Sequence, residues 1–555
     1  MRRINRLPRL LSWWISKSRR QRRRGVLMIC LCVTMIALEP PRANAFQHSL
    51  HFGVVHFPIA CKPEVQEEFD LGLAMLHTFS FPAAAKTFTD ISRKDPDCAM
   101  ADWGLAATAI GSLYGGRPGP MALEGEAAVK KAQTIGGKTP RERDYIETIA
   151  AFYRDADKID YAKRVHAYSN ALEQLHRKYP DDHEAEIFYA YALSAQGAPT
   201  DQTFAYQLKG AAIFEKLLVK LPNHPGVLHY LLHVYDNGPY ASRGLAAARR
   251  LAQVAPSSPH ALQFPAHIFV RLGLWQESID TNRAGSAVDD LFFKPHAMDF
   301  LVDSYLQTGQ DTAAKQVVDE SATIKIIPHL LDAYAVAAMP ARYALERQRW
   351  DEAAALTLPQ QHEFDWSPFP HAEAVLVFAR ALGAARSGNI DGARKDLDRL
   401  QQLRANLIKL NSEGTWQEYW VSQIETHYQM VTAWIAYTQG SRDEALQMLR
   451  AAANREDSTE WDPVMPGRII SARQLLGEML LDANNPRQAL QAFEAALKVE
   501  PGRFLNLYGA ARAAELSGDH ARASAFYARL VGQTAAADID QRPALKTARA
   551  FMTKR

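Results

Sequence analysis

The chain has 555 residues, of which 47% are hydrophobic and 23% charged, a composition typical of a folded protein. Its formal net charge of +3 is unevenly distributed: residues 1–45 hold eleven of the 64 Lys and Arg but one of the 61 Asp and Glu, which leaves 53 basic and 60 acidic residues and a net charge of −7 for the rest. An acidic body of this kind excludes the basic surface of a nucleic-acid-binding protein.

Residues 1–45 are typical of an export signal. A basic run ending at Arg24 precedes the apolar residues 25–38, and the small residues of Ala43-Asn44-Ala45 fit a cleavage site before Phe46. An apolar run of 14 residues is short for a membrane-spanning helix, which needs about 20. We expect a signal peptide or, alternatively, an uncleaved signal-anchor as the only membrane attachment. Either way, we expect an exported body, in the periplasm or cell envelope.

Two of the four cysteines, Cys61 and Cys98, lie outside this segment. An even pair in an oxidising compartment predicts a disulfide, the alternative being two free thiols. The two residues flank the first helix pair, where a bridge would stabilise the N-terminal end of the fold by about 3 kcal/mol.

A four-point pattern of two small residues, an aromatic residue and a proline occurs near both ends of the chain. At offsets of 0, 12, 16 and 24, the positions are Gly72, Ala84, Phe88 and Pro96, and again Gly477, Ala489, Phe493 and Pro501. Small residues let two helices approach, the aromatic ring packs between them, and proline ends the second helix. This spacing resembles the tetratricopeptide repeat (TPR) family, whose unit is a helix–turn–helix of about 34 residues. The resemblance implies an all-α, right-handed superhelical solenoid of TPR-like helix–turn–helix repeats.

Weaker units and Gly-containing turn signals continue this pattern along the chain. Residues 111–143, rich in Gly and Pro, are expected to loop outward. Residues 356–371 contain three prolines and three aromatics and are expected to form an irregular connection. We therefore predict N-terminal repeats over residues 46–355 and C-terminal repeats over 372–555.

Five of the chain's 18 histidines lie in one stretch of 44 residues. His229 and His233 are four apart and share a helix face, and His260 and His267 are two turns apart. His233 and His267 are 34 apart, so they occupy equivalent places in successive repeats. Because the inner helices of a solenoid line a concave groove, we predict a ligand groove there. Its predicted lining is His77, Trp103, His229, His233, His260, His267 and His296.

A metal site is the alternative interpretation of the same histidines. The rings of His229, His233 and His267 could converge on one zinc or other transition-metal ion. The other interpretation is that they form hydrogen bonds with each other, with the backbone or with a bound carboxylate, since an HxxxH pair lacks the glutamate of the metalloprotease motif. Asp299 and Asp303, four residues apart, are expected to form a solvated helix face.

Other chemistry finds no support in the sequence. No GxSxG motif and no phosphate-binding GxxxxGK loop is present, so we expect neither a serine nucleophile nor a bound nucleotide. We predict no catalytic residue, and a binding protein rather than an enzyme.

Residues 55–81, 95–106 and 224–273 resemble a family of exported bacterial TPR proteins of unassigned function. The resemblance is closest over the first half, so family-specific activity is expected within residues 50–310. The leading hypothesis is an exported scaffold that binds a peptide, a protein segment or a small ligand in its groove. The alternative is a metal-binding protein or metal-dependent enzyme that uses the clustered histidines.

Overall fold

The computed structural model describes residues 50–115, 121–197, 201–288, 293–359, 364–410, 416–463, 465–538 and 542–553. The predicted signal segment, residues 1–45, lies outside the described residues. None of the helices in the described ranges combines the length and apolarity needed to cross a membrane.

The described residues form α-helices and two short 3-10 helices, Pro63–Val65 and Leu113–Gly115, joined by turns and loops, with no β-strand among them. The helices before residue 260 are α1 (Gln66–His77), α2 (Phe81–Lys94), α3 (Ala99–Ile110), α4 (Ala122–Ile135), α5 (Pro140–Tyr153), α6 (Tyr161–Lys178), α7 (His183–Ser194), α8 (Ala205–Lys220), α9 (Pro225–Tyr235) and α10 (Ala241–Val254). Those that follow up to residue 386 are α11 (Pro259–Gln263), α12 (Pro265–Leu272), α13 (Trp275–Ser286), α14 (Lys294–Gln307), α15 (Asp311–Ser321), α16 (Leu330–Glu346), α17 (Trp350–Ala354) and α18 (Pro370–Arg386). The last are α19 (Ile390–Lys409), α20 (Trp416–Thr438), α21 (Arg442–Asp457), α22 (Ala472–Asp482), α23 (Pro486–Val499), α24 (Phe504–Leu516), α25 (His520–Gln533) and α26 (Pro543–Thr553).

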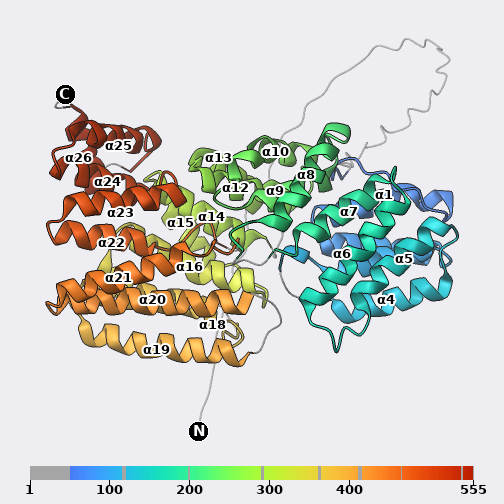
Figure 1. Cartoon of the computed structure of the whole chain (residues 1–555), viewed down its shortest axis with the longest axis horizontal. Coiled ribbons are helices and arrows are strands. Elements are labelled where there is room, and N and C mark those ends of the chain that lie inside the picture. Colours follow the sequence, from blue (N-terminus) through green and yellow to red (C-terminus); the bar gives the residue numbers. More distant parts are fainter. Residues whose placement is uncertain are drawn as a thin grey trace, which may run out of the picture. The chain divides into compact units, whose positions relative to one another are not determined.

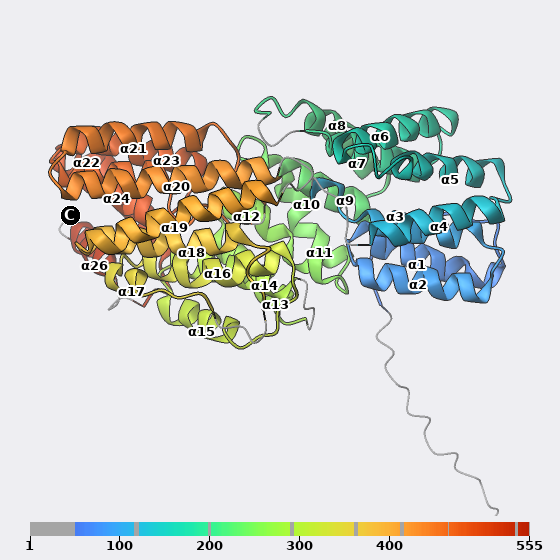
Figure 2. The same ribbon diagram turned by 90° about the horizontal axis from the view of Figure 1, so that it is seen from below.

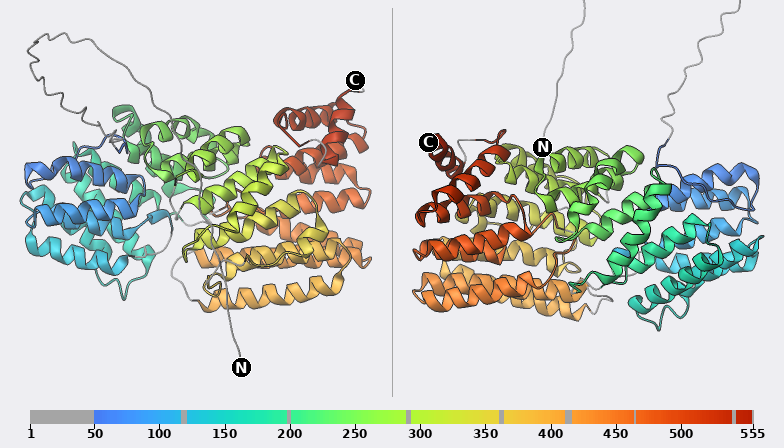
Figure 3. Two further views of the ribbon diagram at one scale, coloured as in Figure 1. Left: turned by 180° about the vertical axis from the view of Figure 1, so that it is seen from behind. Right: turned by 45° about the horizontal axis from the view of Figure 1, so that its top comes forward.

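Almost every α-helix packs on its neighbour along the chain, and several also pack on the next but one, such as α16 on α14 and α18. Figure 1 shows α19 to α24 stacked in chain order, and the two views of Figure 3 show the same succession of orange and red helices. Contacts of this kind define a solenoid of helix pairs. The predicted all-α fold of TPR-like repeats is confirmed.

The repeat signature works through one aromatic ring between two glycines. Phe88 on α2 lies against Gly72 on α1 and Gly104 on α3, where an added Cβ would come within 3.0 and 2.5 Å of the ring. Phe493 stands in the same way between Gly477 and Gly509. Each ring therefore packs against the first helix of its own repeat and of the next.

Two expectations about irregular regions can be compared with the structure. The prediction that residues 111–143 loop outward is wrong, because α4 and the start of α5 occupy most of the segment. Thr139 and Glu142 form a capping box that starts α5. The connection predicted over residues 356–371 runs from the end of α17 to the start of α18, and its residues 360–363 lie outside the described ranges. The flanking helices are in contact, since α16 packs on α18.

The solenoid curls until distant helices meet. The first curl, in the N-terminal part of the chain, brings α1 against α9 (Figure 2 shows both helices). The second curl, in the C-terminal part, brings α14 and α15 toward the segments before α24 and α26. There the buried Arg503 pairs with Asp303 at 2.5 Å and Arg542 with Asp311 at 2.7 Å. Helices far apart in the chain thus meet through packed or ion-paired segments in both parts.

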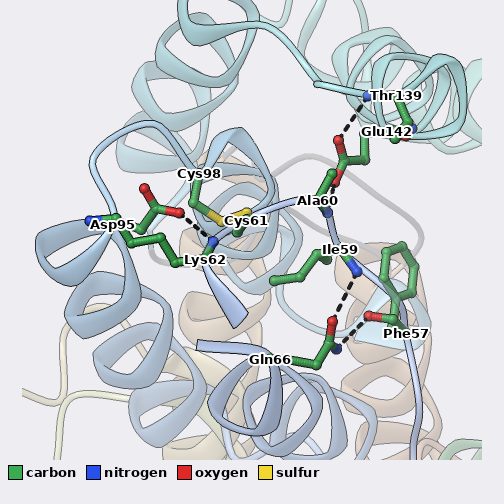
Figure 4. The surroundings of a disulfide bond; sticks show 10 residues. All are labelled: Phe57, Ile59, Ala60, Cys61, Lys62, Gln66, Asp95, Cys98, Thr139 and Glu142. Atoms are coloured by element: carbon green, nitrogen blue, oxygen red, sulfur yellow. Dashed lines mark hydrogen bonds between the residues drawn. A yellow bond between two sulfur atoms is a disulfide. The ribbon is translucent and has the colours of Figure 1, made fainter. Parts of the chain in front are cut away.

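An extended strap, residues 50–62, closes the first curl. The Val54 amide donates to the Asn223 carbonyl before α9, and the Ala60 amide donates to the Glu142 carboxylate on α5. The strap ends where Cys61 forms a disulfide with Cys98, beside the bond from the Lys62 amide to Asp95 (Figure 4).

Candidate functional site

The residues predicted to line an open groove lie inside the protein. His77, Trp103, His229, His260, His267 and His296 are each 6% exposed or less, and His233 is partly buried. The structure therefore corrects the expectation of an open groove at these positions. The physical reason is the curl, which brings α1 against α9 and covers the inner helix faces.

Trp103 belongs to an aromatic core and not to the histidine cluster. Its ring stacks on Phe57 at 5.5 Å and meets Tyr145 and Phe188 edge-on. Burial of so large a ring stabilises the fold, and we assign it no ligand.

His77 and His224 form a fully hydrogen-bonded cluster around Glu184. His77 Nε2 and His224 Nε2 lie 2.9 and 2.8 Å from the two Glu184 carboxylate oxygens. The other nitrogens are also occupied: the Tyr230 hydroxyl lies 3.0 Å from His77 Nδ1, and the Val227 amide donates to His224 Nδ1. Burial would raise the pKa of Glu184, but the two histidines outweigh it and hold that pKa well below its usual range. A buried carboxylate satisfied in this way acts as a structural link between α1, α7 and α9.

Next to it, His229, His233 and His260 bring three ring nitrogens together, one from each residue, within 4.8 Å of one another. His229 Nδ1 lies 2.7 Å from the His77 carbonyl oxygen, which can only accept, so Nδ1 carries the proton. Burial lowers the pKa of His229 to about 3, so its Nε2 has a free lone pair at neutral pH. That Nε2 faces His233 Nε2 at 3.1 Å.

His260 differs from the other histidines of this cluster. It is 6% exposed, and neither of its ring nitrogens has a hydrogen-bond partner among the described residues. Leaving a polar atom buried and unsatisfied costs about 1–3 kcal/mol. An unsatisfied imidazole beside two facing ring nitrogens is the arrangement that a bound ion would complete.

His267 does not join this triangle, because the helix that was expected to carry both His260 and His267 is interrupted. Pro265 starts α12 directly after Phe264, and the two histidines fall on different helices, α11 and α12. His267 Nδ1 lies 2.9 Å from Asp236, and its Nε2 lies 3.2 Å from His296 Nε2 on α14. In the predicted metal triad of His229, His233 and His267, the structure replaces His267 by His260.

Aromatic rings surround the three histidines. Phe79 meets the His229 ring edge-on at 4.5 Å and stacks on His260 at 5.5 Å, Tyr114 stacks on His233 at 4.5 Å, and Phe264 lies 3.9 Å from His233. Phe79 adopts a left-handed backbone conformation, φ 56°, in the turn between α1 and α2. This conformation costs about 1 kcal/mol, and the ring contacts His229 and His260. Burial lowers the pKa values of His233 and His260 well below the usual value, so all three rings are neutral and able to bind a metal.

One edge of the triangle has the spacing of two ligands on a transition-metal ion, and the other edges are at most 4.8 Å long. With Zn–N bonds of about 2.0 Å, two nitrogens in a tetrahedral shell lie about 3.3 Å apart, close to the 3.1 Å between His229 and His233. A carbonyl oxygen on the second nitrogen of a histidine ligand, as on His229, is the usual outer contact of such sites.

A cavity of about 20 Å³, with room for about one water molecule, is lined by apolar and aromatic residues such as Phe79, Tyr191 and Tyr230 and by none of the histidines. A larger pocket of about 340 Å³ lies elsewhere, and none of the seven predicted groove residues lines it. Its lining consists of residues 273–277, Thr308, Gln310, Gly532, Gln533, Ala535 and Ala536.

Asp299 and Asp303 are buried, so the prediction of a solvated face is wrong. Asp299 binds Arg342 at 2.8 Å, and Asp303 binds Arg503. The partners come from α16 and from the turn before α24, and their position beside α14 depends on the second curl.

Sequence reasoning missed several residues that organise the site. Glu184, Tyr230, Asp236, Phe79 and Phe264 position or surround the histidines. Asp236 had a weak signal, since it directly follows the helix that carries His229 and His233. Glu184 had none, being 40 residues from His224.

The fold and the site together define a helical-repeat protein with a buried histidine cluster. No protein-family model matches the chain, and the search of curated proteins finds no match. Among solved structures, the chain is similar to the human IFIT1 dimer with m7Gppp-AAAA, at 13% identity over 78% of this chain and 90% of that chain, with a TM-score of 0.36. The human IFIT1 dimer with PPP-AAAA matches at 13% identity over 85% and 95%, with a TM-score of 0.36. The P58(IPK) TPR domain matches at 12% identity over 88% and 99%, with a TM-score of 0.20. These TM-scores lie below 0.5, so the ligands of those proteins give no information on a ligand of this chain.

Proposed function

We propose that this chain is an exported helical-repeat protein that binds a transition-metal ion through His229, His233 and His260. A helical-repeat fold suits a binding scaffold. Here the inner helix faces are buried, which favours an ion over a peptide as the ligand of the histidine cluster. The observation that carries the proposal is His260, whose buried ring nitrogens lack partners among the described residues while two neutral imidazoles face each other beside it.

Zinc is the first ion to test, because neutral imidazoles suit it and no thiolate belongs to the triangle. Three histidine ligands leave one position of a tetrahedral shell open. Because His229 and His260 are buried and His233 is partly buried, the site suits metal storage, sensing or delivery better than catalysis on a larger substrate.

The test is elemental analysis of the exported chain, purified without a histidine tag, beside His229→Gln and His260→Gln. We expect near-stoichiometric metal in the parent and the loss of one equivalent in each variant. Added zinc should also raise the Tm of the metal-stripped parent by several degrees, since ligand binding to the folded state stabilises it, and should affect the two variants less.

His427→Gln is the matched control. His427 is also buried, its Nδ1 has no hydrogen-bond partner in the described part of the chain, and it stacks on Phe378 far along the chain from the cluster. It should keep the full metal content. Equal metal in the parent and in His260→Gln, or no metal in the parent even after zinc is added, would overturn the proposal.

A further inference from the structure

A second pair of histidines repeats the geometry of the first. His267 Nε2 and His296 Nε2 face each other at 3.2 Å, against 3.1 Å for His229 and His233. Both residues of this second pair are 4% exposed.

The tautomer of His267 is fixed by an ionised carboxylate. Asp236 accepts from His267 Nδ1 at 2.9 Å and from Arg271 Nε at 2.5 Å. His267 Nδ1 is therefore the protonated nitrogen, and Nε2 presents its lone pair toward His296. A carboxylate on the far nitrogen of a histidine ligand is a recurrent outer contact of zinc sites and raises the basicity of the ligand.

The two groups of histidines contact the same aromatic ring, that of Phe264. The Phe264 ring lies 3.9 Å from His233, 4.8 Å from His260 and 4.4 Å from His267. Phe264 lies between α11, which carries His260, and α12, which carries His267. His260 therefore lies beside His229 and His233, whereas His267 lies beside His296.

We propose that His267 and His296 form a second transition-metal position beside the triangle of His229, His233 and His260, so that the chain binds two ions. This inference rests on the proposed function for the class of ligand. The second position has two protein nitrogens against three in the triangle, so its ion should bind more weakly.

The experiment is a titration of the metal-stripped full-length chain with Zn²⁺, read by bound metal per chain, and with Co²⁺, read by visible absorption. We expect two binding steps in the parent. His296→Gln should remove the weaker step and keep the tighter one, whereas His260→Gln should remove the tighter one. His427→Gln should keep both.

A substitution that keeps both rings gives a second measure. Asp236→Asn removes the anionic acceptor of His267 and should weaken the second step about 10- to 100-fold while the first stays unchanged. Asp236→Asn also tests the second position if His296→Gln does not fold, which circular dichroism would reveal.

The outcomes separate the two proposals. A single binding step that neither His296→Gln nor Asp236→Asn alters would overturn the second position and leave the triangle standing, the close pair then being a hydrogen bond between two rings. Two steps in the parent with neither changed in His260→Gln would overturn the triangle instead. Absence of any binding in the parent would overturn both.

Discussion

At the scale of single residues, hydrogen-bond accounting separates the histidines that look alike in the sequence. Every ring nitrogen of His77 and His224 has a partner, whereas neither nitrogen of His260 has one within the described ranges. His77 and His224 therefore stabilise the fold, whereas His260 lacks the partner that a bound ligand would supply.

Buried acids make a prediction about pH at the same scale. Burial raises the pKa of Glu346 from 4.5 to about 7, against the lowering effect of Arg542 and Arg503. Because the folded-state pKa is the higher one, this contribution to stability is fully present below pH 4.5 and is lost as the pH rises through about 7. Glu346→Gln should therefore make the free energy of unfolding less dependent on pH between 4.5 and 7, by at most about 1.4 kcal/mol per pH unit.

Urea unfolding at a series of pH values measures this dependence. The exposed Glu444→Gln is the control and should leave the slope as in the parent. An unchanged slope in Glu346→Gln would mean that the pKa of this carboxyl is the same in the folded and the unfolded protein.

At the scale of elements, the repeat depends on rings that pack against bare backbone. A Cβ on Gly104 would lie 2.5 Å from Cδ1 of Phe88, a ring held between two helices. We expect Gly104→Ala to lower the free energy of unfolding by about 1–3 kcal/mol, the usual cost of overpacking.

Gly532→Ala is the opposite case within another helix. Gly532 lies in α25, is exposed, and has nothing within 4 Å of an added Cβ. This variant should be as stable as the parent or up to about 1 kcal/mol more stable. Denaturant titration of both variants tests the pair, and a Gly104→Ala protein as stable as the parent would contradict the role given to Phe88.

At the scale of the whole described chain, buried ion pairs join segments that are far apart in sequence. Arg542 binds Asp311 across 231 residues, and its Nη1 also donates to the Glu346 carbonyl. Asp311 is fully buried, so loss of its partner leaves a buried charge with reduced compensation.

Arg542→Leu should therefore destabilise the protein by about 3–5 kcal/mol, while Asp311→Leu combined with Arg542→Leu should recover much of the loss. Urea unfolding of both variants measures this. The interpretation fails if the single variant costs less than 1 kcal/mol, or if the double variant is less stable than the single one.

The sequence alone determined the helix pairs, because that information is local. Small residues, an aromatic and a proline at offsets of 0, 12, 16 and 24 specify where two helices touch and where the second ends, and the structure places Phe88 and Phe493 accordingly. The concentration of histidines near α9 and α12 was visible for the same reason.

Only the tertiary structure decided which histidines meet and whether solvent reaches them. The curl that brings α1 to α9 buries His77 and His229, and the break at Phe264 exchanges His267 for His260 in the triangle. The curl depends on small rotations between successive helix pairs, which accumulate along a solenoid and which no short stretch of sequence encodes. The break follows from Pro265, but which histidine it brings into the triangle depends on how α11 and α12 pack on α9. Local spacing could therefore predict a cluster of histidines, but its membership, burial and proton positions follow from contacts between residues as far apart as His77 and His229.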